Sequence, residues 1–293
     1  MQITVGPLYY YWPPQAIVEL CAELMTQPVD RVHLGEVVCS KRRGLRLRDW
    51  LALGRDIRAC GKEVVLSGLT LIEAESEIST VRRVVENGEF PIECNDMAAV
   101  HFAVERGLPF MTGPAVNIYN ADTLAVLARQ GLQRWVPPVE LSRERIAEIL
   151  REAGERNLEV ETEIFARGRL PLAWSARCFT ARHHNRPKDQ CEHWCLRYPE
   201  GIPLKTLDGE NVFQLNGIQT LSGTPCNLIP AWREIRALGA SAVRLSMDRL
   251  EDARQITSIR DTLDERTTTL DVLDCTGANG YWHGIPGMET VTE

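Results

Sequence analysis

Short apolar runs alternate along the chain with longer stretches in which apolar residues recur every three or four positions. The short runs predict strands, and the longer stretches predict helices. The predicted strands are Ile3–Pro7, Val32–Glu36, Glu63–Ser67, Phe90–Cys94, Pro109–Pro114, Arg134–Pro138, Glu159–Phe165 and Ala242–Ser246. The predicted helices are Ala16–Thr26, Trp50–Cys60, Leu71–Glu86, Met97–Arg106, Ala121–Gln130 and Ser142–Arg156. This alternation favours parallel strands joined by crossover helices.

Eight strands in this order predict one α/β domain over residues 1–293, a (β/α)-barrel of the TIM type. A doubly wound open sheet is the alternative. The alternation stops between residues 166 and 230, where Arg, His, Cys, Pro and Gly are frequent. We expect that segment to be a Cys-rich insertion after the seventh strand. We expect the Gly-rich segment from residue 277 onward to be loosely ordered.

The composition is that of a globular protein without a membrane span. A chain of 293 residues is long enough for one such barrel, and 44% hydrophobic with 25% charged residues is typical of globular proteins. The net charge of −7 disfavours binding of nucleic acid by charge alone, although a local basic patch would still allow it. No apolar stretch is long enough for a membrane span, and the start lacks the pattern of a secretory signal. We therefore expect a cytoplasmic protein.

Nine cysteines are too few for a disulfide framework in a chain of this length. Cys178, Cys191 and Cys195 lie in the polar insertion, separated by twelve and three residues, which predicts metal ligands. Cys39 is the candidate fourth ligand. It follows the second strand, and in a barrel it would therefore share the carboxyl-terminal mouth with the loop after the seventh strand. The spacing alone fits either structural zinc or an iron–sulfur cluster.

The other candidate side chains have structural explanations. We expect the remaining cysteines to be buried or incidental residues; these are Cys21, Cys60, Cys94, Cys226 and Cys275. His183, His184 and His193 are expected to be ordinary polar loop residues, with hydrogen bonding to the metal site as the alternative. The aromatic run from Tyr9 to Trp12 is expected to pack in the core, with an aromatic wall for a ring substrate as the alternative.

Basic residues flank two of the candidate ligands. We expect an exposed rim that binds a substrate carboxylate, formed by Arg42, Arg43, Arg177 and Arg182. The alternatives are a solvated loop, or cations that offset the charge of a cluster. The chain has no His-Glu-x-x-His motif and no Gly-x-Ser-x-Gly motif, which disfavours peptidase chemistry, and we assign no catalytic residue.

Several longer motifs resemble the collagenase-like peptidase family, most of whose members are not demonstrated peptidases. They are EVVCSKRR at 36–43, VENGEF at 85–90, PVELS at 138–142, LPLA at 170–173 with ARCFTAR at 176–182, and NGIQT at 216–220. The likeness runs from the first strand to about residue 282. It is most specific to the branch that serves oxygen-independent ubiquinone biosynthesis.

The resemblance implies a 4Fe–4S cluster held by Cys39, Cys178, Cys191 and Cys195. It also implies a heterodimer with a UbiU-like paralogue that hydroxylates a ubiquinone precursor without O₂, with prephenate as the oxygen donor suggested by relatives. A lipid-binding accessory protein would present the precursor. One alternative is a prephenate-dependent tRNA-base hydroxylase, which the net charge of −7 disfavours. Another is a non-catalytic subunit that transfers electrons or stabilises its partner.

Overall fold

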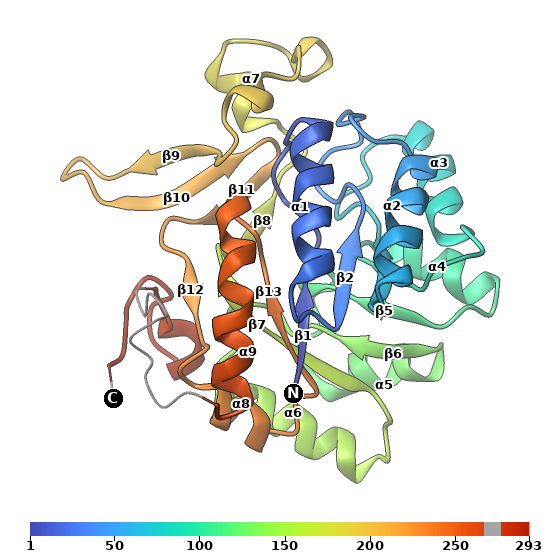
Figure 1. Ribbon diagram of the computed structural model, residues 1–293, viewed down its shortest axis with the longest axis vertical. Coiled ribbons are helices and arrows are strands. Elements are labelled where there is room, and N and C mark those ends of the chain that lie inside the picture. The colour runs from blue at the N-terminus through green and yellow to red at the C-terminus, as the bar shows by residue number, and fades with distance from the viewer. Residues whose placement is uncertain (267–276, 293) are drawn as a thin grey trace.

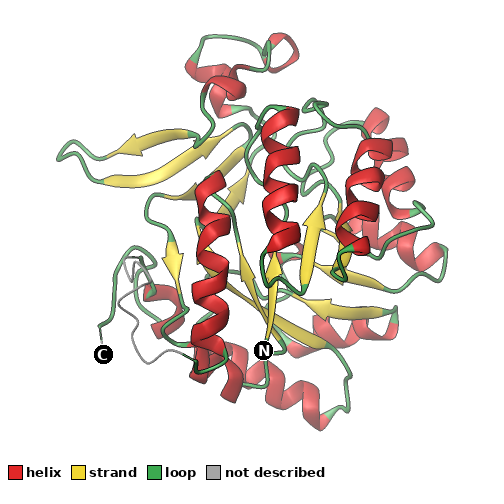
Figure 2. Ribbon diagram, viewed as in Figure 1, coloured by secondary structure: helices red, strands yellow, loops and turns green. Residues whose placement is uncertain are grey.

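A closed barrel of eight parallel strands forms the centre of the computed structural model, which describes residues 1–266 and 277–292 (Figures 1 and 2). Neighbouring strands pair in chain order from the first to the seventh, and the last strand closes the barrel between the seventh and the first. The strands are β1 (Gln2–Val5), β2 (Arg31–Leu34), β3 (Glu63–Ser67), β4 (Ile92–Cys94), β5 (Phe110–Thr112), β6 (Leu132–Trp135), β7 (Glu161–Gly168) and β13 (Ala242–Leu245). The predicted barrel is confirmed, and the open-sheet alternative is wrong.

Helices cover the outside of this barrel (Figure 2). They are α1 (Pro14–Thr26), α2 (Leu47–Ala59), α3 (Glu75–Val85), α4 (Met97–Glu105), α5 (Ala121–Arg129), α6 (Arg143–Glu155), α8 (Trp232–Ala237) and α9 (Ile256–Leu263). Two begin at predicted caps: the Asn120 side chain accepts from the Thr123 amide at 2.8 Å, and Ser142 accepts from Arg145 at 3.4 Å. Within the described part of the chain, no helix has the length and apolarity to cross a lipid bilayer.

The segment after β7 forms a separate antiparallel sheet that projects from the barrel (Figure 1). Its strands, in spatial order, are β8 (Pro171–Trp174), β11 (Gln219–Ser222), β10 (Asn211–Asn216) and β9 (Ile202–Lys205). The cysteine-bearing loop between β8 and β9 contains the short helices α7 (Phe179–His183), η2 (Lys188–Gln190) and η3 (Trp194–Arg197). The chain then returns to the barrel through β12 (Cys226–Asn227), which pairs with β7. Because β7 extends to Gly168, this insertion starts slightly later than the sequence pattern predicts.

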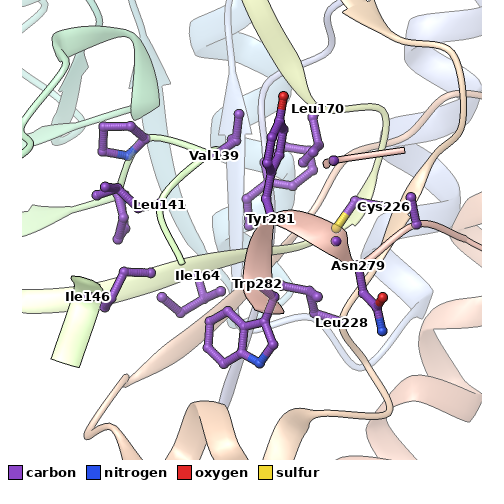
Figure 3. Close-up of a pocket in the computed structure, with 16 residues that line it drawn as sticks. Val139, Leu141, Ile146, Ile164, Leu170, Cys226, Leu228, Asn279, Tyr281 and Trp282 are labelled. Carbon is purple, nitrogen blue, oxygen red and sulfur yellow. The ribbon is translucent and has the colours of Figure 1, made fainter. Parts of the chain in front are cut away.

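The C-terminal segment is ordered, contrary to the prediction of a loose tail. Residues 277–292 fold back through η6 (Gly280–His283), and the Trp282 indole donates to Glu234 on α8 at 3.1 Å. Trp282 is buried. Together with Leu141 and Ile146 it lines a small, mainly apolar cavity of about 30 Å³ (Figure 3). The amphipathic pattern needed to predict this packing is absent, because a few aromatic side chains make the contact without a regular helix.

The interior of the barrel carries ion pairs in place of the branched apolar residues usual in such barrels. The Arg244 guanidinium donates to Glu163 and Glu93, each at 2.5 Å. The His33 imidazole lies 3.3 Å from Glu93, and Arg134 donates to Glu163 at 3.2 Å. All five side chains are buried. This group, the lumen network, joins β2, β4, β6, β7 and β13 at the barrel axis.

Candidate functional site

Cys39 lies in a tight turn after β2, at the carboxyl-terminal mouth of the barrel. The Glu36 carboxylate accepts hydrogen bonds from the amides of Val38 at 2.9 Å and Cys39 at 3.0 Å. The Arg42 amide closes the same turn on the Cys39 carbonyl at 2.9 Å. One carboxylate therefore fixes the backbone that carries the half-buried Cys39 thiol.

The other three candidate ligands lie in the insertion and are also half-buried. Cys178 precedes α7, and its sulfur accepts from the Ala181 amide at 3.4 Å. Cys191 follows η2, and Cys195 lies within η3. The residues between them include Glu192 and His193 in left-handed conformation, with φ of 49° and 52°. Two successive non-glycine residues of this kind make a sharp turn at an energetic cost, which is typical of functional sites.

Direct contacts join the Cys39 turn to the insertion. The Lys41 ammonium donates to the Asp189 carboxylate at 2.8 Å and to the Lys188 carbonyl at 3.0 Å. The His193 Nε2 atom lies 2.8 Å from the Lys41 carbonyl. Lys188 in turn pairs with Glu73 before α3. These contacts bring Cys39 to the loop of Cys178, Cys191 and Cys195, although it precedes Cys178 by 139 positions.

Electrostatic interactions connect the three sulfurs of the insertion, and Arg42 acts on both Cys195 and Cys39. Burial raises the pKa of the Cys195 thiol, Arg42 lowers it, and Cys178 and Cys191 raise it further. Burial likewise raises the pKa of Cys39, which hydrogen bonding to the Lys41 amide and the charges of Arg42 and Lys188 partly offset. Buried thiols beside cations are suited to binding as thiolates once a positive metal replaces their protons.

Four cysteine thiols suit an iron–sulfur cluster in number and in ligand type. Over residues 1–266 and 277–292, no three His, Cys, Asp or Glu side chains converge closely enough to hold one metal ion. A 4Fe–4S cluster does not need that convergence, because each of its four thiolates binds a different iron atom. The four half-buried sulfurs and their neighbouring cations match the ligand type and the negative charge of such a cluster.

The other cysteines lie away from this loop. Cys21, Cys94 and Cys226 are buried in α1, β4 and β12, and Cys60 is exposed where α2 ends. Burial raises the pKa of the Cys21 and Cys226 thiols to about 12, so both are neutral at physiological pH. Cys275 lies outside the described residues. The described members of this group fit the structural interpretation made from their sequence contexts.

Arg42 differs from the prediction of an exposed rim. Its side chain is 1% exposed, and it donates to the Tyr9 carbonyl at 2.8 Å and to the Asn216 amide oxygen at 2.7 Å. Arg42 therefore joins the first strand's loop to β10 beneath the cysteine loop, and its place in an exposed rim is wrong. The rim prediction remains for the other three residues, which are exposed: Arg43, Arg177 and Arg182.

We expect Arg42→Gln to destabilise the fold by about 1–3 kcal/mol. The buried Asn216 amide oxygen loses its donor, and the Tyr9 carbonyl keeps the hydrogen bond from the Asn216 side chain. The neighbouring exposed Arg43→Gln should change the free energy of unfolding by less than about 0.5 kcal/mol. Urea denaturation of both variants measures the difference. Equal stabilities of the two variants would contradict a structural role for Arg42.

Aromatic residues attach the insertion to the barrel. Tyr9 to Trp12 are all buried, as the core interpretation predicts, and the Trp12 indole donates to the Pro199 carbonyl at 2.9 Å. In the insertion, His184 stacks on Trp194 at 4.0 Å between ring centroids, and its Nε2 atom lies 2.8 Å from the Tyr198 hydroxyl. These histidines and aromatics hold the cysteine loop in place without themselves forming a ligand set.

Sequence reasoning missed Asp248, which follows β13 at the same mouth. The Tyr10 hydroxyl donates to Asp248 at 3.2 Å, and the Arg169 amide donates to it at 3.2 Å. Burial raises the pKa of Asp248 to about 6, although Arg169 opposes the shift. The sequence could have indicated Asp248, because it follows a predicted barrel strand and the functional residues of such barrels come from the carboxyl ends of the strands.

We expect Asp248→Asn to stabilise the protein at pH 7 by roughly 1–3 kcal/mol. The folded-state pKa lies above the unfolded value, so the ionised carboxylate costs stability above pH 6 and nothing below about pH 3.8. The variant and the wild type should therefore converge as the pH falls towards 4. Urea denaturation at several pH values checks this, and a pH-independent difference would contradict it.

Solved structures with similar folds share little sequence with this chain. A truncated form of 3-deoxy-D-arabino-heptulosonate 7-phosphate synthase from Thermotoga maritima is 11% identical, with 90% of this chain and 87% of that chain covered and a TM-score of 0.49. Orotidine 5'-phosphate decarboxylase from Pyrococcus horikoshii OT3 is 11% identical, with coverages of 89% and 99% and a TM-score of 0.46. We draw no functional argument from likenesses of this size.

The sequence itself matches a family model. The model of Peptidase family U32 covers residues 17–267, which include all eight barrel strands but the first, and the whole insertion. This confirms the family that the longer sequence motifs indicate. The chain therefore belongs to Peptidase family U32.

Proposed function

We propose that this U32 protein is of the UbiV type, a 4Fe–4S protein that acts with a UbiU-like paralogue in the O₂-independent hydroxylation of a ubiquinone precursor. Cys39, Cys178, Cys191 and Cys195 would hold the cluster. The observation that carries the proposal is the contact of the Cys39 turn with the cysteine loop, made by Lys41 with Asp189 and by His193 with the Lys41 carbonyl. These contacts hold the turn that carries Cys39 against the loop that carries the other three cysteines.

The residues around the sulfurs have separate roles in this proposal. Glu36 orients the Cys39 backbone through two amide hydrogen bonds. Arg42, Lys41 and Lys188 offset negative charge at the thiolates. The left-handed pair Glu192 and His193 sets the turn between Cys191 and Cys195. When bound, an iron–sulfur cluster supplies one-electron transfer at a potential tuned by such neighbours.

The rest of the pathway assignment rests on the family motifs. They support prephenate as the oxygen donor and a heterodimer with the paralogue, to which a lipid-binding accessory protein would present the precursor. We expect co-expression with the paralogue to increase the soluble yield. The pair should elute together in size-exclusion chromatography, and two independent monomers would contradict the heterodimer.

Cells that lack this protein, grown without oxygen, test the proposed activity. Wild-type protein should restore ubiquinone, whereas Cys178→Ser should not, because it removes one thiolate from the donor set. Cys226→Ser, a buried cysteine outside that set, is the matched control and should restore ubiquinone fully. Normal ubiquinone with Cys178→Ser, or ubiquinone restored fully without the paralogue, would contradict the proposal.

A further inference from the structure

A large cavity lies beside the Cys39 turn, between α2 and α3 and at the carboxyl ends of β2 and β3. Its volume is about 650 Å³, within the range of about 300–1,000 Å³ that holds small-molecule ligands. Figure 1 shows α2 and α3 as neighbours on the outside of the barrel. The cavity is separate from the small apolar cavity beneath Trp282.

The floor of this cavity is apolar. Leu34 ends β2, Leu66 is the penultimate residue of β3, and both are buried, as is Val81 on α3. Trp50 on α2 adds an aromatic surface. An apolar floor with one large aromatic side chain favours the body of a flat or extended apolar ligand.

The rim of the cavity is cationic, in a protein whose net charge is −7. Of its charged side chains, five are basic and three acidic. Lys41 is paired with Asp189, and Arg42 is buried in the hydrogen bonds described above. Arg43, Arg46 and Arg83 form no ion pair with a carboxylate among the described residues, so their charge is available to a ligand.

We infer that this cavity binds an amphiphilic anion, a molecule with an apolar or aromatic body and one anionic head group. The body lies on Trp50 and the leucine floor, and the head group binds Arg43, Arg46 and Arg83 through charge-assisted hydrogen bonds. The inference deepens the proposed function, because the cavity adjoins the turn that carries Cys39. The proposed function bears only on which molecule binds in the cell; binding of an amphiphilic anion in the cavity is inferred independently of it.

Anilinonaphthalene sulfonate is a suitable probe, because it combines an aromatic body with an anionic head. We expect saturable binding of one molecule per chain to anaerobically purified wild-type protein, read by probe fluorescence. The double variant Arg46→Gln/Arg83→Gln should weaken binding at least tenfold, since each lost charge-assisted bond is worth about 1.5 kcal/mol or more. Neutral N-phenylnaphthylamine should bind the wild type and the double variant alike, because it has no head group.

A filling variant tests the location. Thr80 lines the cavity from α3, so Thr80→Trp should abolish binding of both probes. Ser79→Trp, at an exposed position of the same helix outside the lining, should not. Arg48→Gln, on α2 but outside the lining, is the charge control. Absence of saturable binding to the wild type, or equal binding by all variants, would overturn the inference. Iron content is measured on the same samples, so that loss of the cluster and loss of the cavity are distinguished.

Discussion

Replacing Cys39 by alanine is expected to remove the iron–sulfur absorbance of anaerobically purified protein and most of its iron. One iron atom would lose its thiolate, and an iron site left open in this way loses metal readily. The barrel itself should stay folded, because Cys39 is half-buried and the Glu36 carboxylate still holds its turn. Visible absorbance, iron content and far-ultraviolet circular dichroism measure these effects together.

Cys226→Ala and Cys60→Ala are the controls for that variant. The first removes a buried sulfur at β12 and the second an exposed sulfur at the end of α2, and neither lies in the cysteine loop. Both should keep full absorbance and iron. A Cys39→Ala protein with a full 4Fe–4S complement, beside a Cys226→Ala protein that has lost it, would show that the ligand assignment is wrong.

Replacing Arg244 by leucine should cost about 3–5 kcal/mol of stability, a large part of the roughly 5–15 kcal/mol of a typical domain. The guanidinium is the shared donor to Glu93 and Glu163, both fully buried. Leucine removes their strongest partner and, among the described residues, leaves Glu93 with only His33 as a basic partner. Glu163 keeps only Arg134 and Arg31 among them. Urea denaturation measures the loss. Arg249→Leu breaks an exposed pair with Glu200 and should cost less than about 1 kcal/mol.

The pH dependence gives a second check on Arg244. Burial alone would raise the pKa of Glu93, but Arg244 and His33 hold it well below its usual range. The stability gained from that depressed pKa is present above about pH 4 and is lost as the pH falls further. The difference between the wild type and Arg244→Leu should therefore shrink below pH 4. A loss under about 1 kcal/mol at pH 7 would contradict the structural role of the lumen network.

Local pattern was sufficient to predict the barrel. Residues 63–67 are predicted as a strand and form one, because a short run rich in β-branched residues favours a strand buried between its neighbours. Asn120 and Ser142 cap helices as predicted, because capping depends on residues three positions apart. Helices and strands are therefore predictable from the sequence where the interactions that form them are local.

Long-range contacts were not predictable in the same way. Arg42 lies in a run of basic residues, which is typical of an exposed loop, but Tyr9 and Asn216 provide acceptors that bury it. Glu93, Glu163 and Arg244 lie on three different predicted strands. They become partners only because the closed barrel brings these strands together around one interior. The C-terminal segment packs through Trp282, without the periodicity that marks a buried helix.

Iron and acid-labile sulfide analysis of anaerobically purified protein determines whether the proposed cluster is present. We expect iron and sulfide in equal amounts, four of each per chain for a 4Fe–4S cluster, with absorbance that bleaches in air. The half-buried sulfurs of Cys39, Cys178, Cys191 and Cys195 would then hold the iron. Stoichiometric zinc without iron or sulfide would contradict the proposed 4Fe–4S cluster.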